Sequence, residues 1–207
     1  LKRIRDYKVN LQNTTSNKAT TIDRKMSALS KMLQTAVDEG WLAAKPSFTT
    51  ILSGLKQDDI CRTAYLSEAD EAEFLKRCKV HAGNGQAPKW DLFHDFVCFL
   101  IDTGARTYLE GLALTASPNS HTSCIQWHNN TCLFPITKTG TPRAVPMTPR
   151  VKKILKDRCE KIRTAPEPHN RIWKGLTKDS VRHYWDTIRA EMGWADNKDY
   201  CPYICRH

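Results

Sequence analysis

The sequence feature that most constrains the fold is a change of periodicity along the chain. Apolar residues recur every three or four positions through most of the 207 residues, which is typical of helices. After Pro118, however, three short β-prone runs (TSCIQW, TCLFPI and PRAVPM) are separated by turn-forming residues, and helical periodicity returns from about Pro149. This order predicts a mainly helical α+β chain with a small three-stranded antiparallel sheet of two hairpins.

The first long periodic segment covers residues 20–39. Its apolar side chains share one helical face, and Gly40 is placed to end the helix (Ile22, Met26, Leu29, Leu33 and Ala36). Arg24, Lys25 and Lys31 lie off this face. We expect them to point outward, where they can contact phosphates.

A break in periodicity divides the chain into two domains. Residues 53–65 are rich in turn-forming and polar residues, so we expect a linker between a helical domain at 1–52 and a second domain at 66–207. In the second domain, Ser67 and Asp70 have the spacing of a helix-capping pair. Further helices are predicted from about Pro88 to Gly104, from Pro149, and from Thr177.

The net charge of +10 is unevenly distributed. Residues 1–50 contain nine Lys/Arg against four Asp/Glu, residues 51–136 seven against ten, and residues 137–207 sixteen against eight. Two basic blocks that flank an acidic middle favour a polyanion as partner, and nucleic acid ahead of membrane, because no basic stretch has a strong apolar face. A generally basic surface that keeps the protein soluble is the alternative.

The cysteines and the hydropathy exclude other classes of protein. Eight cysteines are scattered singly, without the spacing of a zinc site or a redox CxxC pair, so we expect reduced, mostly buried thiols, with a disulfide scaffold in a secreted protein as the alternative. No apolar run approaches the ~18 residues of a membrane span, and the first ten residues lack the apolar segment of a secretion signal. A soluble intracellular protein is expected.

Three short stretches contain the candidate chemistry. TGARTYLEGLAL places Arg106 just after a helix-ending glycine, TKTG places Lys138 at a hairpin, and CPYICRH places Arg206 near the end of the sequence. Phosphoryl transfer concentrates negative charge on phosphate oxygens. Guanidinium groups bind two such oxygens at once, and an ammonium can protonate a leaving alkoxide.

These stretches, in this order, resemble those of the tyrosine recombinase family, which includes the phage integrases and the Xer-like resolvases. ATTIDRKMSALSKMLQTAVDEGWL resembles the DNA-clasping helix of the family's core-binding domain, and AYLSEADEAEFLKRC the opening of its catalytic domain. ITKTGTPRAVPMT resembles the hairpin with the catalytic lysine, and PYICRH the His-x-x-Arg-His box. The resemblance implies a partial core-binding domain at 1–52 and, at 66–207, a catalytic domain truncated before its nucleophile segment.

The resemblance also implies roles for individual residues. Arg106 and Arg206 would hold the scissile phosphate, and Lys138 would give a proton to the departing 5′-oxygen. Tyr203 takes the place of the first histidine of the box; its hydroxyl can donate a hydrogen bond to phosphate, but with an ordinary pKa of about 10 it is a poor proton acceptor. His207 would be a supporting neighbour, and Arg143 would bind DNA.

Two departures from the family pattern bear on the site. The family's acidic residue usually lies three positions after the first arginine, but here Leu109 has that place and Glu110 follows it. Either the helix begins with a bulge or the alignment shifts by one residue. The family's tyrosine nucleophile lies a few dozen residues beyond the second arginine, so we expect it after His207, outside this sequence.

The resemblance therefore implies part of a phage-type integrase, a site-specific recombinase that cuts and rejoins duplex DNA through a 3′-phosphotyrosyl intermediate. The resemblance implies no metal or other cofactor, a homotetramer on two DNA duplexes, accessory DNA-bending proteins, and viral genome integration in the cytoplasm or nucleoid of a bacterial host. The alternative is a non-catalytic DNA-binding relative that contacts phosphates alone. An RNA-binding module is disfavoured because the aromatic platform for stacking bases is missing.

Overall fold

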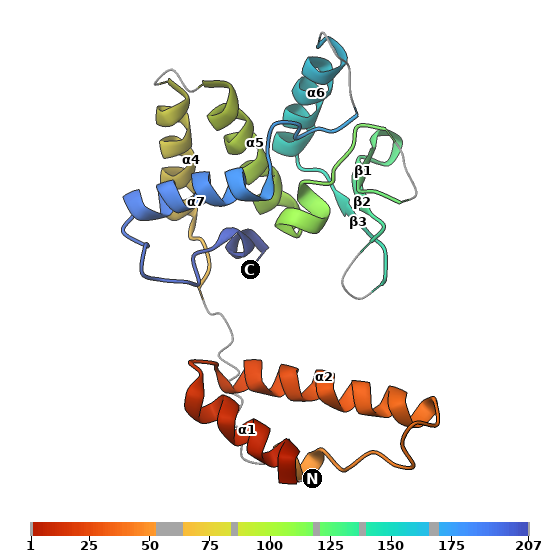
Figure 1. Ribbon diagram of the computed structural model, residues 1–207. Coiled ribbons are helices and arrows are strands. Elements are labelled where there is room, and N and C mark those ends of the chain that lie inside the picture. Colours follow the sequence, from red (N-terminus) through yellow and green to blue (C-terminus); the bar gives the residue numbers. More distant parts are fainter. Residues whose placement is uncertain are drawn as a thin grey trace. The chain divides into compact units, whose positions relative to one another are not determined.

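The computed structural model describes residues 2–52, 64–83, 87–117, 121–136, 140–165 and 170–206 (Figure 1). The chain divides into two compact units, Leu1–Cys61 and Arg62–His207. This division falls within the range 53–65 that the sequence suggests for a linker, of which residues 53–63 lie outside the described part. Each unit is described by itself below.

The first unit is a helical hairpin of α1 (Lys2–Thr14) and α2 (Ala19–Asp38), followed by the short α3 (Thr49–Leu52) (Figure 1). The apolar face predicted for residues 20–39 forms its core, in which Ile22 and Met26 of α2 are buried with Leu11 of α1. Gly40, with a φ of +75°, follows the end of α2, as predicted. The sequence pattern did not indicate α1, because Leu11 is its only buried residue.

The second unit is built around α5 (Ala87–Thr103), whose side chains from Phe96 to Leu100 are all buried. Helices α4 (Glu68–Gly83), α6 (Pro149–Arg163) and α7 (Lys178–Glu191) pack against α5 (Figure 1). The predicted cap of α4 is present: the Asp70 amide donates to Ser67 Oγ, and the Ser67 amide donates to the Asp70 carboxylate. Thr177 and Ser180 form a capping box at α7.

A three-stranded antiparallel sheet completes this unit, as the sequence predicted. Strands β1 (Cys124–Gln126), β2 (Thr131–Phe134) and β3 (Arg143–Pro146) pair in the order β1-β2-β3. Asn130, in the left-handed region with a φ of 51°, leads into β2 after the short 3₁₀ turn η2 (Trp127–Asn129). Phe134 pairs with Arg143, which are the last residue of β2 and the first of β3. This pair closes the base of the hairpin whose connection contains Lys138.

The buried thiols of this unit belong to the core. Cys78, Cys98, Cys132 and Cys205 are buried and take no part in disulfides. Burial raises the pKa of each thiol, that of Cys132 to about 12, so these thiols are protonated near neutral pH. No helix within the described ranges is both long and apolar enough to cross a membrane.

Candidate functional site

The candidate site begins where α5 ends. Gly104 has a φ of +55°, and the chain then enters η1 (Thr107–Gly111), a single turn of π-helix. The amide of Gly111 donates to the Arg106 carbonyl and that of Leu112 to the Thr107 carbonyl, each across five residues. The turn therefore holds one residue more than an α turn, and Glu110 reaches back to Arg106. From the sequence, the position of Glu110 could reflect either a bulge at the start of the helix or a shift of the alignment by one residue. The structure contains such a bulge, in the form of this π turn.

Glu110 is the buried centre of the site, with an exposed fraction of 0%. Its Oε1 accepts from Arg106 Nη1 at 2.6 Å, while its Oε2 accepts from the Arg106 amide at 2.8 Å and from Arg143 Nη2 at 2.7 Å. Burial alone would raise the pKa of this carboxyl. The hydrogen bonds from the Arg106 amide and from the Arg143 and Arg106 guanidinium groups outweigh burial and hold the pKa below its ordinary value.

A second acceptor, the Gly104 carbonyl, brings in the third arginine. It accepts from Arg143 Nη2 and from Arg206 Nη1, each at 3.0 Å. Arg206 ends the 3₁₀ turn η3 (Pro202–Arg206), and its Nη1 lies 3.7 Å from Glu110 Oε2. Arg106 and Arg206, which are 100 positions apart in the sequence, thus lie together, whereas Lys138 and His207 lie outside the described residues.

The charge in this arginine cluster (Arg106, Arg143 and Arg206) is not balanced by Glu110. Three guanidinium groups face one carboxylate, and their side chains remain 16%, 28% and 33% exposed. Burial and repulsion from Arg143 and Arg106 lower the pKa of Arg206, against the attraction of Glu110. An anion with several oxygens, such as a phosphodiester, would relieve this repulsion and accept charge-assisted hydrogen bonds.

Tyr203 lies beside the cluster, on η3. Its side chain is 36% exposed and lines a hollow of about 340 Å³ between η3 and α7. Lys178 Nζ lies 5.5 Å from the centre of the Tyr108 ring in the same hollow, and Arg182 and Arg189 of α7 also line it. Asp186 lines it too, 3.6 Å from Arg182 Nε and 3.5 Å from Arg189 Nη2, so three basic side chains and one acidic side chain of α7 border the turn that ends in Arg206.

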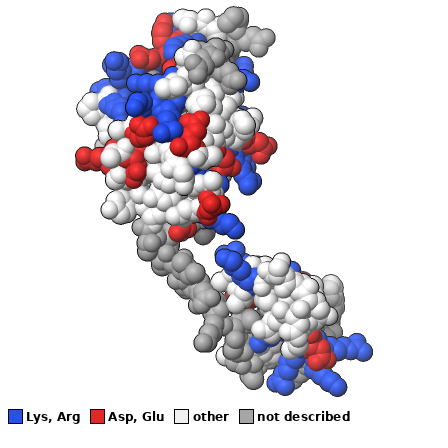
Figure 2. Space-filling view, turned by 90° about the vertical axis from the view of Figure 1, so that its left-hand side faces the viewer, with Lys and Arg blue, Asp and Glu red and all other residues white. Residues whose placement is uncertain are grey.

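The other residues predicted to contact DNA lie in the first unit. Arg24, Lys25 and Lys31 are exposed on α2. The face of the molecule in Figure 2 shows that lysine and arginine side chains are interspersed with acidic ones over the larger unit, so the net charge does not form one uniform basic surface. The local clusters of basic side chains are therefore more distinctive than the total charge.

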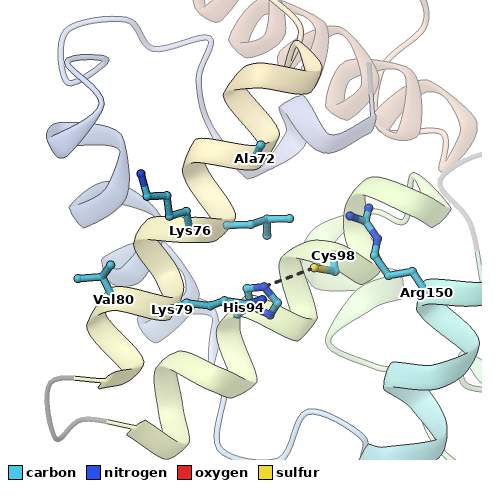
Figure 3. A pocket seen from close by; sticks show the side chains of 8 residues that line it. Ala72, Lys76, Lys79, Val80, His94, Cys98 and Arg150 are labelled. Atoms are coloured by element: carbon cyan, nitrogen blue, oxygen red, sulfur yellow. Dashed lines mark hydrogen bonds between the residues drawn. The ribbon is translucent and has the colours of Figure 1, made fainter.

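A second hollow, of about 610 Å³, contains a cysteine and histidine pair that resembles a nucleophilic site (Figure 3). Cys98 Sγ lies 4.0 Å from His94 Nε2, one turn away on α5. Burial raises the pKa of Cys98 to about 12, which leaves the thiol protonated. Arg150, also at this hollow, is bound by Asp102 and Glu71. We therefore assign this hollow no chemistry.

Sequence comparisons identify no relative: no family model matches the chain, and none of the curated proteins does. Solved structures do match. The integrase of transposon Tn1549 bound to a circular intermediate DNA has a TM-score of 0.66 at 18% identity, over 99% of this chain and 69% of that chain. A variant with another circular intermediate DNA gives 0.67 at 16% identity, and a variant with the transposon right end DNA gives 0.63 at 16%, over the same shares.

The chain therefore has the fold of an integrase, with the mainly helical architecture and the small antiparallel sheet expected from the tyrosine recombinase resemblance. The particular fold it shares is that of the Tn1549 integrase.

Proposed function

We propose that this chain is part of a site-specific DNA recombinase of the tyrosine recombinase family, which cuts and rejoins duplex DNA through a 3′-phosphotyrosyl intermediate. The observation that supports this best is the meeting of Arg106, Arg143 and Arg206 around one buried carboxylate. These arginines come from three distant segments of a chain with an integrase fold, and the Tn1549 integrase structures contain DNA.

In the proposed reaction, Arg106 and Arg206 hold the two non-bridging oxygens of the scissile phosphate. Their charge stabilises the pentacoordinate phosphorus that forms when a tyrosine hydroxyl attacks and gives up its proton to water. The bond from phosphorus to the 5′-oxygen breaks, and the Lys138 ammonium gives that oxygen its proton. By the resemblance, the attacking tyrosine lies after His207. Rejoining is the reverse step, with the 5′-hydroxyl of a second duplex as nucleophile.

Other residues have supporting parts in this proposal. Tyr203 donates a hydrogen bond to the phosphate, and His207 supports Arg206. In the first unit, Arg24, Lys25 and Lys31 contact the backbone of the duplex, and in the second unit the basic side chains of α7 make backbone contacts of their own. Guanidinium and ammonium groups supply the positive charge that the reaction needs, so it proceeds without a metal or other cofactor.

The biological setting belongs to the same proposal. We propose a homotetramer on two duplexes, assisted by DNA-bending proteins, that acts as a phage-type integrase for viral genome integration in the cytoplasm or nucleoid of a bacterial host.

A specific feature favours the alternative, a non-catalytic DNA-binding relative. Tyr203 stands where the family has a histidine, and a phenol accepts a proton poorly near neutral pH. Such a protein would use the same arginine cluster to bind the backbone of DNA without cutting it.

One experiment separates the two functions. First, duplexes that bind the immobilised protein are selected from a random-sequence library. The selected duplexes are then synthesised as a series, in which each member has a nick beside a different phosphate. They are then incubated with the protein as its gene encodes it, and covalent complexes are detected by denaturing electrophoresis. The recombinase is expected to form such a complex, and Lys138→Ala to form it about 10²- to 10⁴-fold more slowly. Tight binding without any covalent complex would instead establish the non-catalytic relative.

A further inference from the structure

The contacts of Arg143 differ from those expected of a residue that binds DNA directly. Its Nη2 donates to Glu110 Oε2 at 2.7 Å and to the Gly104 carbonyl at 3.0 Å. Its guanidinium carbon lies 4.8 Å from the centre of the Phe134 ring, on the strand partner directly opposite. Three segments, the end of α5, η1 and β2, therefore fix the position of this one side chain.

The two acceptors of Arg143 are the same groups that hold the other arginines. Glu110 also accepts from Arg106, and the Gly104 carbonyl also accepts from Arg206. Arg143 thus lies at the middle of a continuous chain of hydrogen bonds from Arg106 to Arg206. If Arg143 were lost, Glu110 and Gly104 would each lose a donor, and both neighbouring arginines would lose part of their support.

We propose that Arg143 is a positioning residue that ties the β2–β3 hairpin to the arginine cluster. This inference rests on the proposed function. The pair Phe134 and Arg143 closes the base of the hairpin, and Lys138 lies in the connection between these two residues. Arg143 therefore holds the base of this hairpin and the two phosphate-binding arginines in one fixed arrangement.

The salt dependence of DNA binding tests whether Arg143 instead contacts phosphate. Affinity for a fluorescein-labelled duplex is measured by anisotropy at several salt concentrations for the wild type, Arg143→Met and Arg206→Met. Each phosphate contact contributes about 0.9 to the slope of log K against log salt. We expect Arg206→Met to lower the slope by about 0.9 and Arg143→Met to leave it unchanged. An equal drop for Arg143→Met would overturn the inference.

A conservative variant separates positioning from charge. Arg143→Lys keeps the positive charge but cannot reproduce the planar group that contacts Glu110, Gly104 and Phe134 together. In the nicked-duplex assay at saturating DNA, we expect Arg143→Lys to slow covalent complex formation at least tenfold while the Kd changes less than threefold. A lysine variant with the wild-type rate would show that the charge alone matters, and would refute positioning.

The energetic coupling between Arg143 and Glu110 tests the chain of hydrogen bonds through protein stability alone, with no DNA present. Unfolding equilibrium constants are compared for Arg143→Met, Glu110→Gln and the double variant. We expect the double variant to be at least fivefold more stable than the product of the single effects predicts, because each single change already breaks the shared contact. Effects that multiply within about twofold would contradict the chain.

The two proposals fail in different ways. If neither the wild type nor any variant binds duplex DNA or forms a covalent complex, the proposed function fails, while the coupling between Arg143 and Glu110 still tests the chain of hydrogen bonds. If the wild type is active and Arg143→Lys is equally active, only the positioning role fails.

Discussion

Replacing Glu110 by glutamine tests the centre of the arginine cluster directly. The two side chains have nearly the same shape, but glutamine is neutral and turns one hydrogen-bond acceptor into a donor. That donor would face the N–H groups of Arg106 or Arg143, which now donate to Glu110. Breaking a buried, hydrogen-bonded ion pair costs about 3 to 5 kcal/mol. For a protein of this size, this corresponds to a drop in Tm of about 6 to 20 °C.

The effect has a defined pH dependence. Because the folded-state pKa of Glu110 lies below its ordinary value, the unfolded chain binds more protons at low pH. The stabilisation from the carboxylate is complete above the ordinary glutamate pKa of about 4.3 and is lost as the pH falls through the depressed folded-state pKa. The Tm gap between the wild type and Glu110→Gln should therefore be constant from pH 7 to about pH 5 and shrink below that.

Calorimetry or circular dichroism on the whole chain measures both quantities. The matched control is Glu71→Gln, because Glu71 also accepts from an arginine, Arg150, but the two side chains are 25% and 39% exposed. A partly exposed pair contributes at most about 1 kcal/mol, or about 2 to 4 °C in Tm. If Glu110→Gln lowered Tm no more than this control, or if its Tm gap did not change with acid, Glu110 would not be the charged centre that stabilises the arginine cluster.

Two further predictions concern the borders of the site. Gly111→Ala adds a Cβ 2.9 Å from Leu100 Cδ2 and 3.1 Å from Phe96 Cε2. We expect this overpacking to lower the free energy of unfolding, measured by chemical denaturation, by about 1 to 3 kcal/mol. An unchanged denaturation midpoint would show that η1 can move to accept the methyl group. Arg182→Gln on α7, where the side chain is 76% exposed and 3.6 Å from Asp186, should lower the salt slope of DNA binding by about 0.9 without changing Tm. The control Arg163→Gln on α6, where the side chain is 75% exposed and 2.8 Å from Glu160, should leave the slope unchanged.

Local patterns in the sequence were sufficient for much of the fold. The change from helical periodicity to short β-prone runs between turn-forming residues predicted the sheet, and the caps at Ser67 and Thr177 lie where the sequence placed helix starts. Helix α1 was missed because its only buried side chain is Leu11, and it is held by packing on α2 and not by its own amphipathic pattern. Periodicity detects elements with a broad apolar face and overlooks those that depend on a neighbour.

The site was predictable only in part, because it also depends on contacts between segments that are distant in the sequence. Arg106 and Arg206 could be proposed from short motifs, but their meeting at Gly104 and Glu110 depends on how α5, β3 and η3 pack together. The guanidinium of Arg143 could not be placed from sequence, since an arginine on a strand can equally face solvent or the protein. Here the stacking on Phe134 and the two acceptors near α5 decide between these orientations.

The position of Glu110 shows why spacing along the chain and spacing in the fold can differ. Glu110 lies one residue later than the family pattern has its acidic residue, and a count along the sequence would therefore leave it out. The π turn of η1 takes up the extra residue, and Gly111 packs against Leu100 and Phe96 with no room for a side chain, which keeps the turn close to α5. The carboxylate can then bind the Arg106 amide and guanidinium together. In this chain the π turn thus brings a carboxylate four residues after Arg106 onto both the amide and the guanidinium of that arginine.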